Sequence, residues 1–239
     1  MTDNTGENYK SFKNWKPESF GSINKEDSVY FDNEFRLITR EKLDNKRILE
    51  IGFGNGSFAS WAIKKGCIYF GFEKIPDLVE VAKDCGFKAH DVTVPFDKVI
   101  PLNSLDYIVA FDVFEHLDKE EFHQMLGEFT KVLKSGGKVI GRVPSGDSPF
   151  SVSLQNGDYT HKTYFGSSMI SQFAISNNFT VDSIRSPAFP IYGMGLVSVT
   201  KRLFVSAARK FFYPLIIKIF MGGNKIVLTP NMIFVLRKP

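Results

Sequence analysis

The residues best suited to chemistry are an acid and three glycines near position 50. Glu50 is followed at every second position by a glycine, in the run Glu50, Gly52, Gly54 and Gly56. Glycines at alternate positions let the backbone turn sharply and leave no side chain between it and a ligand. The run ends a short apolar segment, residues 47–51, and precedes apolar residues at helical spacing. The pattern therefore predicts a strand, a glycine turn and a helix whose first N–H groups face a bound nucleotide.

Three further acids follow apolar segments. Glu73 ends one of them roughly twenty residues past the turn, the spacing at which an acid accepts hydrogen bonds from ribose hydroxyls. Asp91 and Asp112 come at the ends of two later apolar segments. Because the carboxyl ends of parallel strands share one edge of a sheet, we expect these acids and Gly52 to lie together there.

Two of the four histidines are candidate bases. His161 ends the polar run Asp158-Tyr159-Thr160-His161, which should roof the ligand crevice, and Asp158 could orient His161 or bind a substrate hydroxyl itself. His116 follows the apolar segment that ends at Asp112. Each histidine could instead hold a structural hydrogen bond. The histidines, at positions 90, 116, 123 and 161, are scattered along the sequence, so we predict no metal site.

The elements that must position these residues follow from the alternation of apolar runs and amphipathic segments. This alternation predicts an α/β fold with a doubly wound, mostly parallel sheet of seven strands. The expected strands are residues 47–51, 67–73, 87–90, 105–112, 138–143, 179–186 and 231–237. The expected helices are residues 28–42, capped by Asp27, then 75–85, 119–133 and 166–178, and residues 134–137 should form a turn.

Length and composition indicate one globular domain. The 239 residues suffice for a full core, and 43% of them are hydrophobic. We divide the chain into an N-terminal extension with a cover helix (1–46), an α/β core (47–186), an insertion (187–225) and a closing strand (226–239). We expect Phe12, Trp15 and Phe20 of the extension to pack on the core. The formal net charge of +4 is too small to argue for nucleic acid.

Two features bear on the cellular location. Residues 1–8 are polar and lack the apolar centre of a signal peptide, and we expect a cytoplasmic protein. Residues 200–221 combine large apolar side chains with five Lys and Arg and no acid, interrupted by Pro214. Such a basic amphipathic helix can lie in a membrane surface. It could instead be a lid that packs on the active site or on a second subunit.

The run from Glu50 to Gly56 resembles the first motif of class I S-adenosylmethionine (SAM) methyltransferases. The resemblance implies SAM as cofactor, with the glycine turn and Glu50 at its amino-acid end. Glu73 would then bind the ribose, and Asp91 and Val92 would face the adenine. Asp112 belongs to the same implied cofactor site.

Later segments extend this resemblance. Residues 113–117 are similar to the "VxEH" segment that many such enzymes carry beside the methyl-transfer site. In the class I fold the last strand runs antiparallel between the fifth and sixth. A dinucleotide site is the competing interpretation, but Ser57 stands where the third glycine of that fingerprint would fall.

Residues 142–150 and 155–161 resemble a narrower subgroup, the bacterial methyltransferases of surface-polysaccharide (LPS/O-antigen) gene clusters. This implies SAM-dependent O-methylation of a sugar, in a surface polysaccharide or its lipid-linked precursor. The protein would work in the cytoplasm or on the inner face of the membrane. Three alternatives remain open: methylation of a quinone or another small apolar acceptor at the membrane, a non-catalytic scaffold with a methyltransferase fold, and an NAD-dependent oxidoreductase.

Overall fold

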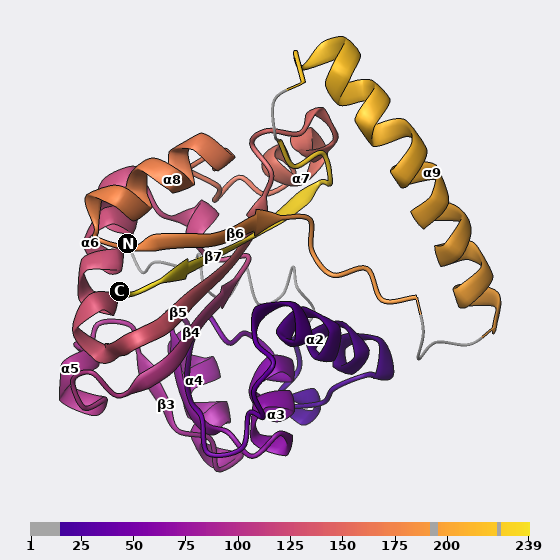
Figure 1. Cartoon of the computed structure of the whole chain (residues 1–239). Coiled ribbons are helices and arrows are strands. Elements are labelled where there is room, and N and C mark those ends of the chain that lie inside the picture. The colour runs from indigo at the N-terminus through magenta and orange to yellow at the C-terminus, as the bar shows by residue number, and fades with distance from the viewer. Residues whose placement is uncertain (1–14, 192–195, 224–225) are drawn as a thin grey trace.

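The computed structural model describes residues 15–191, 196–223 and 226–239, which form a seven-stranded sheet of order β3-β2-β1-β4-β5-β7-β6 (Figure 1). The strands are β1 Arg47–Ile51, β2 Ile68–Glu73, β3 Ala89–Asp91, β4 Leu105–Phe111, β5 Leu133–Pro144, β6 Thr180–Arg185 and β7 Asn231–Arg237. The first five strands pair in parallel, and β7 runs antiparallel to both β5 and β6. The expected doubly wound sheet is confirmed, including the place of the last strand.

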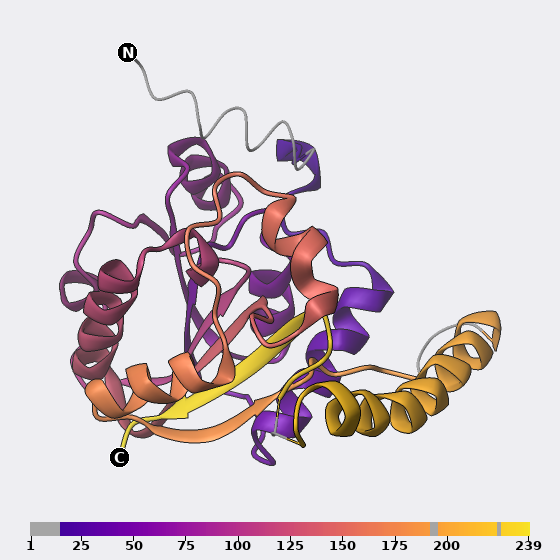
Figure 2. The same ribbon diagram turned by 90° about the horizontal axis from the view of Figure 1, so that it is seen from above.

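Helices cover both faces of the sheet. The α-helices are α2 Lys25–Ile38, α3 Ser57–Lys64, α4 Pro76–Asp84, α5 Phe96–Val99, α6 Lys119–Val132, α7 Val152–Asn156, α8 Ser167–Ser176 and α9 Leu196–Phe220. Three short 3₁₀ turns are η1 Pro17–Ser19, η2 Phe114–His116 and η3 Pro149–Ser151. Helices α2 and α3 lie on one face, and α6 and α8 lie on the other (Figures 1 and 2).

The core is divided by the sheet because successive side chains of a strand point to opposite faces. Ile48 of β1 packs with the aromatic residues of α2 and α3, whereas its neighbour Leu49 packs with those of α6. The central strands are buried on both faces, as in a parallel sheet covered by helices. The loops at the carboxyl ends of the strands are therefore anchored on a sheet that is packed on both faces.

Helix α2 begins and ends earlier than predicted. Its N-cap is Asn24, whose side-chain oxygen accepts from the backbone N–H of Asp27 at 2.8 Å. The predicted cap, Asp27, therefore lies inside the first turn. Thr39 is extended and ends the helix, so Leu37 lies near its end and is 61% exposed.

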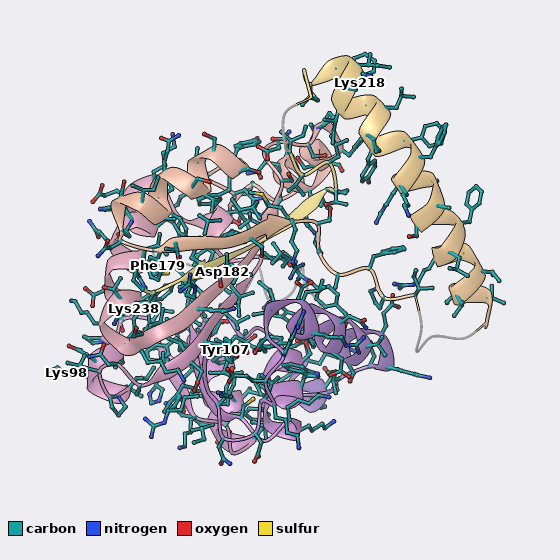
Figure 3. All side chains as sticks on the ribbon, viewed as in Figure 1. Lys98, Tyr107, Phe179, Asp182, Lys218 and Lys238 are labelled. Carbon is teal, nitrogen blue, oxygen red and sulfur yellow. The ribbon has the colours of Figure 1, made fainter. Side chains whose placement is uncertain are left out.

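The predicted turn at residues 134–137 is wrong, because these residues are part of β5. Their backbone finds its partner near the C-terminus. The N–H of Gly136 donates to the carbonyl of Lys238, and the N–H of Lys238 donates to the carbonyl of Gly137, both at 2.9 Å. Figure 3 shows Lys238 beside this end of the sheet. A turn-like sequence extends the strand because a distant segment pairs with it.

Helix α9 continues through Pro214, where an interruption was expected. Proline removes one intrahelical hydrogen bond, which disfavours a helix without forbidding it. None of the helices in the described parts of the chain combines the length and apolar character needed to cross a bilayer.

Candidate active site

The glycine turn connects β1 to α3 in a backbone conformation that glycine favours. The φ angles of Gly52, Gly54 and Gly56 are +70°, +52° and +74°. Space is also short, because a Cβ on Gly52 would lie 2.6 Å from Cγ2 of Val113. The turn therefore packs directly against the segment that follows β4.

Two aromatic residues of the N-terminal extension cover the other glycines. A Cβ on Gly54 would lie 2.8 Å from Cζ2 of Trp15, and one on Gly56 would lie 2.7 Å from Cζ of Phe20. The expected packing of Trp15 and Phe20 on the core is confirmed, whereas Phe12 lies outside the described residues. The structure adds that the contact is made at the glycine turn.

Glu73 joins the end of β2 to the glycine turn. Its Oε2 accepts from the N–H of Gly54 at 3.1 Å, and its Oε1 accepts from the N–H groups of Lys74 and Ile75 at 2.8 and 3.1 Å. A carboxylate has about four lone-pair positions, so Oε2 can still accept from a ribose hydroxyl. Burial raises the pKa of Glu73, although these N–H donors oppose the shift.

Glu50 is buried beneath the turn. Its Oε2 accepts from the hydroxyl of Tyr69 at 2.7 Å. Burial raises the pKa of Glu50 to about 8, opposed by that hydroxyl and assisted by the charge of Glu73. The predicted role of Glu50 at the amino-acid end of SAM stays a prediction.

Asp91 stands beside Glu73, because these two residues pair in the register of β2 and β3. Its Oδ1 accepts from the N–H and the hydroxyl of Thr93, at 2.8 and 2.6 Å. These bonds lower the pKa of Asp91. Val92 follows it with an exposed side chain. Asp91 and Val92 thus lie near Glu73, the candidate ribose-binding residue. Their predicted contact with adenine stays a prediction.

Asp112 is held by a residue that the sequence analysis did not single out for a role. Nε of Arg142 donates to its Oδ1 at 2.9 Å, and Nη2 donates to Oδ2. The guanidinium also lies 5.1 Å from the ring of Phe111. The sequence could have indicated this role, because Arg142 stands near the end of a predicted central strand and a charge there needs a partner. Asp112 thus enters the site as half of a bidentate ion pair.

His116 and His161 lie together although 45 positions separate them. Their ring centroids are 4.7 Å apart. Nδ1 of His161 lies 3.0 Å from the carbonyl oxygen of Gln155, which can only accept, so this nitrogen carries the proton. Nε2 of His161 is then the basic nitrogen, and it lies 4.0 Å from Oε1 of Glu115.

Asp158 is linked to both histidines. Its side chain contacts His116 through Thr160, and its backbone carbonyl accepts from the N–H of His161 at 3.2 Å, so the predicted orientation of His161 by Asp158 stays a prediction. Oδ1 of Asp158 accepts from the hydroxyl of Thr160 at 2.6 Å, and Oγ1 of Thr160 lies 2.8 Å from Nδ1 of His116. The side chain of Asp158 faces Thr160 because residues 158–160 form a tight polar turn. The sequence analysis assigned no role to Thr160. The spacing Asp-x-Thr, which is typical of such a turn, could have indicated one.

Although the histidines are far apart in the sequence, the fold brings His116 and His161 together beside an acid. Glu115, His116 and His161 place one possible ligand atom each within 4.8 Å of one another. The other two histidines are elsewhere. His123 lies on α6, with Nδ1 2.9 Å from Nδ2 of Asn177, and the ring of His90 lies 5.2 Å from that of Phe72.

The amides of the glycine turn distinguish SAM from a dinucleotide. Gly52, Gly54 and Gly56 donate their N–H groups to Phe72 O, Glu73 Oε2 and Phe53 O respectively. A pyrophosphate would need free N–H donors at this turn. SAM has no phosphate that would require these donors, whereas Glu73 could accept from the ribose of either cofactor. The donor set therefore fits SAM.

Comparison with known proteins agrees with this geometry. Residues 49–141 match a family model described as "Methyltransferase domain". A protein of Anoxybacillus flavithermus named "Uncharacterized methyltransferase" is 28% identical over 137 residues, which cover 54% of this chain and 63% of that protein. The match thus spans less than two thirds of that relative.

Solved structures share the fold. A SAM-dependent methyltransferase from Archaeoglobus fulgidus has a TM-score of 0.62 at 18% identity, and the match covers 90% of this chain and 95% of that one. One from Mesorhizobium loti also has a TM-score of 0.62, at 13% identity, with 90% and 100% covered. Residues 49–141 thus match a methyltransferase domain, and the chain shares the class I fold of these solved SAM-dependent methyltransferases.

Proposed function

We propose that the protein is a SAM-dependent methyltransferase that methylates a sugar hydroxyl, in a surface polysaccharide or its lipid-linked precursor. SAM supplies a methyl group already activated by its sulfonium. The chain must then align the acceptor, exclude water and take up the acceptor's proton.

One observation carries the proposal of an oxygen acceptor. Nδ1 of His116 and Nδ1 of His161 both face hydrogen-bond partners, and each arrangement leaves Nε2 as the basic nitrogen. A hydroxyl is a poor nucleophile unless a base takes its proton. Two imidazoles held in this way, close to the turn-bearing edge of the sheet, fit that requirement.

The sugar part of the proposal rests on the sequence resemblance of residues 142–150 and 155–161, supported by the loop itself. Tyr159 lies in that loop between Asp158 and Thr160, and its side chain is highly exposed. An exposed aromatic ring offers an apolar surface on which the C–H face of a sugar can pack. Asp158 and Thr160 beside it are polar.

A transfer experiment tests the acceptor class. Purified protein is incubated with methyl-labelled SAM and an extract of the source cells, and the extract is fractionated. We expect label in the polysaccharide or organic-extractable fraction, released by acid hydrolysis as an O-methylated monosaccharide. Label in protein, nucleic acid or soluble small molecules would overturn the sugar assignment. Loss of SAM binding by the folded protein would favour the scaffold interpretation.

A quinone or another small apolar acceptor at the membrane is the second candidate. It is favoured by the exposed apolar side chains of α9, which could bring the enzyme to such a substrate. The same histidines would serve a phenolic hydroxyl. The labelled product would then enter the organic phase, and hydrolysis would release no methylated sugar.

A further inference from the structure

Helix α9 stands away from the sheet in two perpendicular views (Figures 1 and 2). Its contacts with the rest of the protein come from one side. Arg202 pairs with Glu26 of α2 and donates to the carbonyl of Pro190 at 3.1 Å. Arg209 lies over the ring of Phe189 at 4.7 Å. Nearer its C-terminal end, Ile217 borders a cleft of about 750 Å³ that Ile184 of β6 also lines.

The opposite side of α9 is apolar and uncovered. At 100° per residue, five side chains fall on one side of the helix within an arc of about 80°. We call them the outer seam: Val197, Phe204, Phe211, Leu215 and Ile219. Val197, Phe204 and Phe211 are 84%, 76% and 68% exposed, and the other two are also exposed. A continuous exposed apolar strip of this kind marks an interaction surface.

The charges beside the outer seam have one sign. Lys201 and Lys218 lie about 60° and about 40° from Phe204 around the helix, on opposite sides of it. Both are exposed, and Lys218 also borders the cleft that Ile217 lines. Lys210 is a third exposed cation, and α9 contains no Asp or Glu. Figure 3 shows Lys218 at the upper end of the helix. A partner of the outer seam must therefore offer an apolar surface to the seam and negative charge to the lysines that flank it.

We infer that α9 is an interfacial anchor, which lays its outer seam into the surface of an anionic lipid bilayer. Apolar side chains enter the boundary between headgroups and acyl chains, and the flanking lysines meet the negative headgroups. Helix α9 thus lies on the membrane. This surface is separate from the methyl-transfer site and does not depend on which acceptor is used.

The charge pattern disfavours a second copy of the chain as the partner. Pairing two α9 helices in antiparallel orientation would set Lys201 of one against Lys218 of the other. Parallel pairing would set each lysine against its own equivalent. Neither arrangement supplies an acid from α9, so like charges would meet across the contact. Anionic lipids supply the missing negative charge.

Vesicle flotation of the full chain tests this inference. One set of vesicles is pure phosphatidylcholine, and the other contains phosphatidylglycerol at roughly one lipid in three. We expect binding to the anionic vesicles to be about tenfold or more stronger than to the neutral ones, and to weaken as salt is added.

Variants separate the outer seam from exposed apolar residues in general. Phe204→Ser combined with Phe211→Ser should weaken binding to anionic vesicles about tenfold or more, since each change removes a buried aromatic ring from the lipid. The matched control, Leu37→Ser combined with Ile175→Ser, changes exposed apolar residues of α2 and α8 and should bind as the wild type does. Lys201→Glu combined with Lys218→Glu should remove the preference for anionic lipid.

Each protein is first checked for unchanged SAM affinity and melting temperature, so that loss of fold or of the cofactor site is recognised separately. Absence of binding by the folded wild type would overturn the inference, as would unchanged binding after the two Phe substitutions. A dimer in sedimentation that the Phe204→Ser, Phe211→Ser variant dissociates, without vesicle binding, would assign the seam to contact between copies.

Discussion

Oγ1 of Thr160 lies 2.8 Å from Nδ1 of His116, and the same hydroxyl donates to Asp158 at 2.6 Å. The hydroxyl has one proton. Burial opposes ionisation of Asp158, but the hydrogen bonds from Thr160 and the nearby imidazoles hold its pKa below the usual value. An ionised Asp158 can only accept, so the hydroxyl of Thr160 directs its one proton to Asp158, and Oγ1 must accept from Nδ1–H of His116. Thr160 thereby makes Nε2 the basic nitrogen of His116.

Thr160 is therefore expected to be a positioning residue. Thr160→Val keeps the shape and removes the hydroxyl, and we expect kcat to fall about tenfold to a hundredfold with SAM affinity unchanged. Thr160→Ser should restore most of the rate. The acidic limb of the kcat–pH profile, where activity is lost as the base is protonated, should move in the Val variant. Equal kcat values and profiles for Val and wild type would show that the chain from Asp158 to His116 does not matter for turnover.

His161→Ala tests the second imidazole. SAM affinity should be retained, and turnover should fall about a hundredfold to ten-thousandfold if Nε2 takes the acceptor's proton. His123→Ala is the control, because His123 lies on α6 and is hydrogen-bonded to Asn177. Isothermal titration with SAM and initial-rate measurements distinguish the two effects. Full activity of the His161 variant would leave His116 as the remaining candidate base.

Glu73→Ala should weaken SAM binding. The variant loses an acceptor for ribose and also releases the N–H of Gly54, which Glu73 holds at 3.1 Å. Hydrogen bonds to charged groups contribute about 1.5 to 3 kcal/mol, so Kd should rise about tenfold to a hundredfold. Glu80→Ala, an exposed change on the neighbouring helix α4, should bind SAM normally. Normal affinity of the Glu73 variant in calorimetry would contradict the cofactor assignment.

Trp15 should report cofactor binding by fluorescence. The chain has two tryptophans, and Trp61 is buried with its Nε1 donating to Asp32 at 2.9 Å. Trp15 instead lies against Gly54 of the turn. We expect SAM to change the emission of the wild type and of Trp61→Phe, but not that of Trp15→Phe. A response that follows Trp61 would show that SAM does not reach the surface covered by Trp15.

Glu50 should make stability depend on pH. Its pKa is raised from an ordinary 4.5 to about 8 in the folded chain, so the folded state binds its proton more tightly than the unfolded state. Stability from this group is therefore full below about pH 4.5 and is lost as pH rises towards about 8. Glu50→Gln should remove this dependence. Between about pH 5 and pH 9, the wild type should lose roughly 2 to 5 kcal/mol relative to the variant.

Urea unfolding of both proteins at the two pH values measures that difference. Parallel curves for wild type and Glu50→Gln would mean that Glu50 titrates normally in the folded protein. Because the comparison is between two proteins, titration of all other groups cancels to a first approximation.

The sequence determined the parts of the fold whose causes are local. Three glycines at alternate positions fixed the turn after β1, since their spacing permits the positive φ angles found there. Apolar runs set the strands, and β7 begins and ends at the predicted residues, Asn231 and Arg237. The acids Glu73 and Asp91 could be placed at one edge because parallel strands end together.

Only the tertiary structure decided contacts between residues far apart in the chain. It placed the hydroxyl of Thr160 between Asp158 and His116, and it paired Asp112 with Arg142. It also extended β5 by pairing Gly136 with Lys238. The apolar and basic residues of α9 were visible in the sequence, but which of them stay uncovered was not. Periodicity describes what one segment prefers, whereas a hydrogen-bond partner is chosen by geometry that many segments build together.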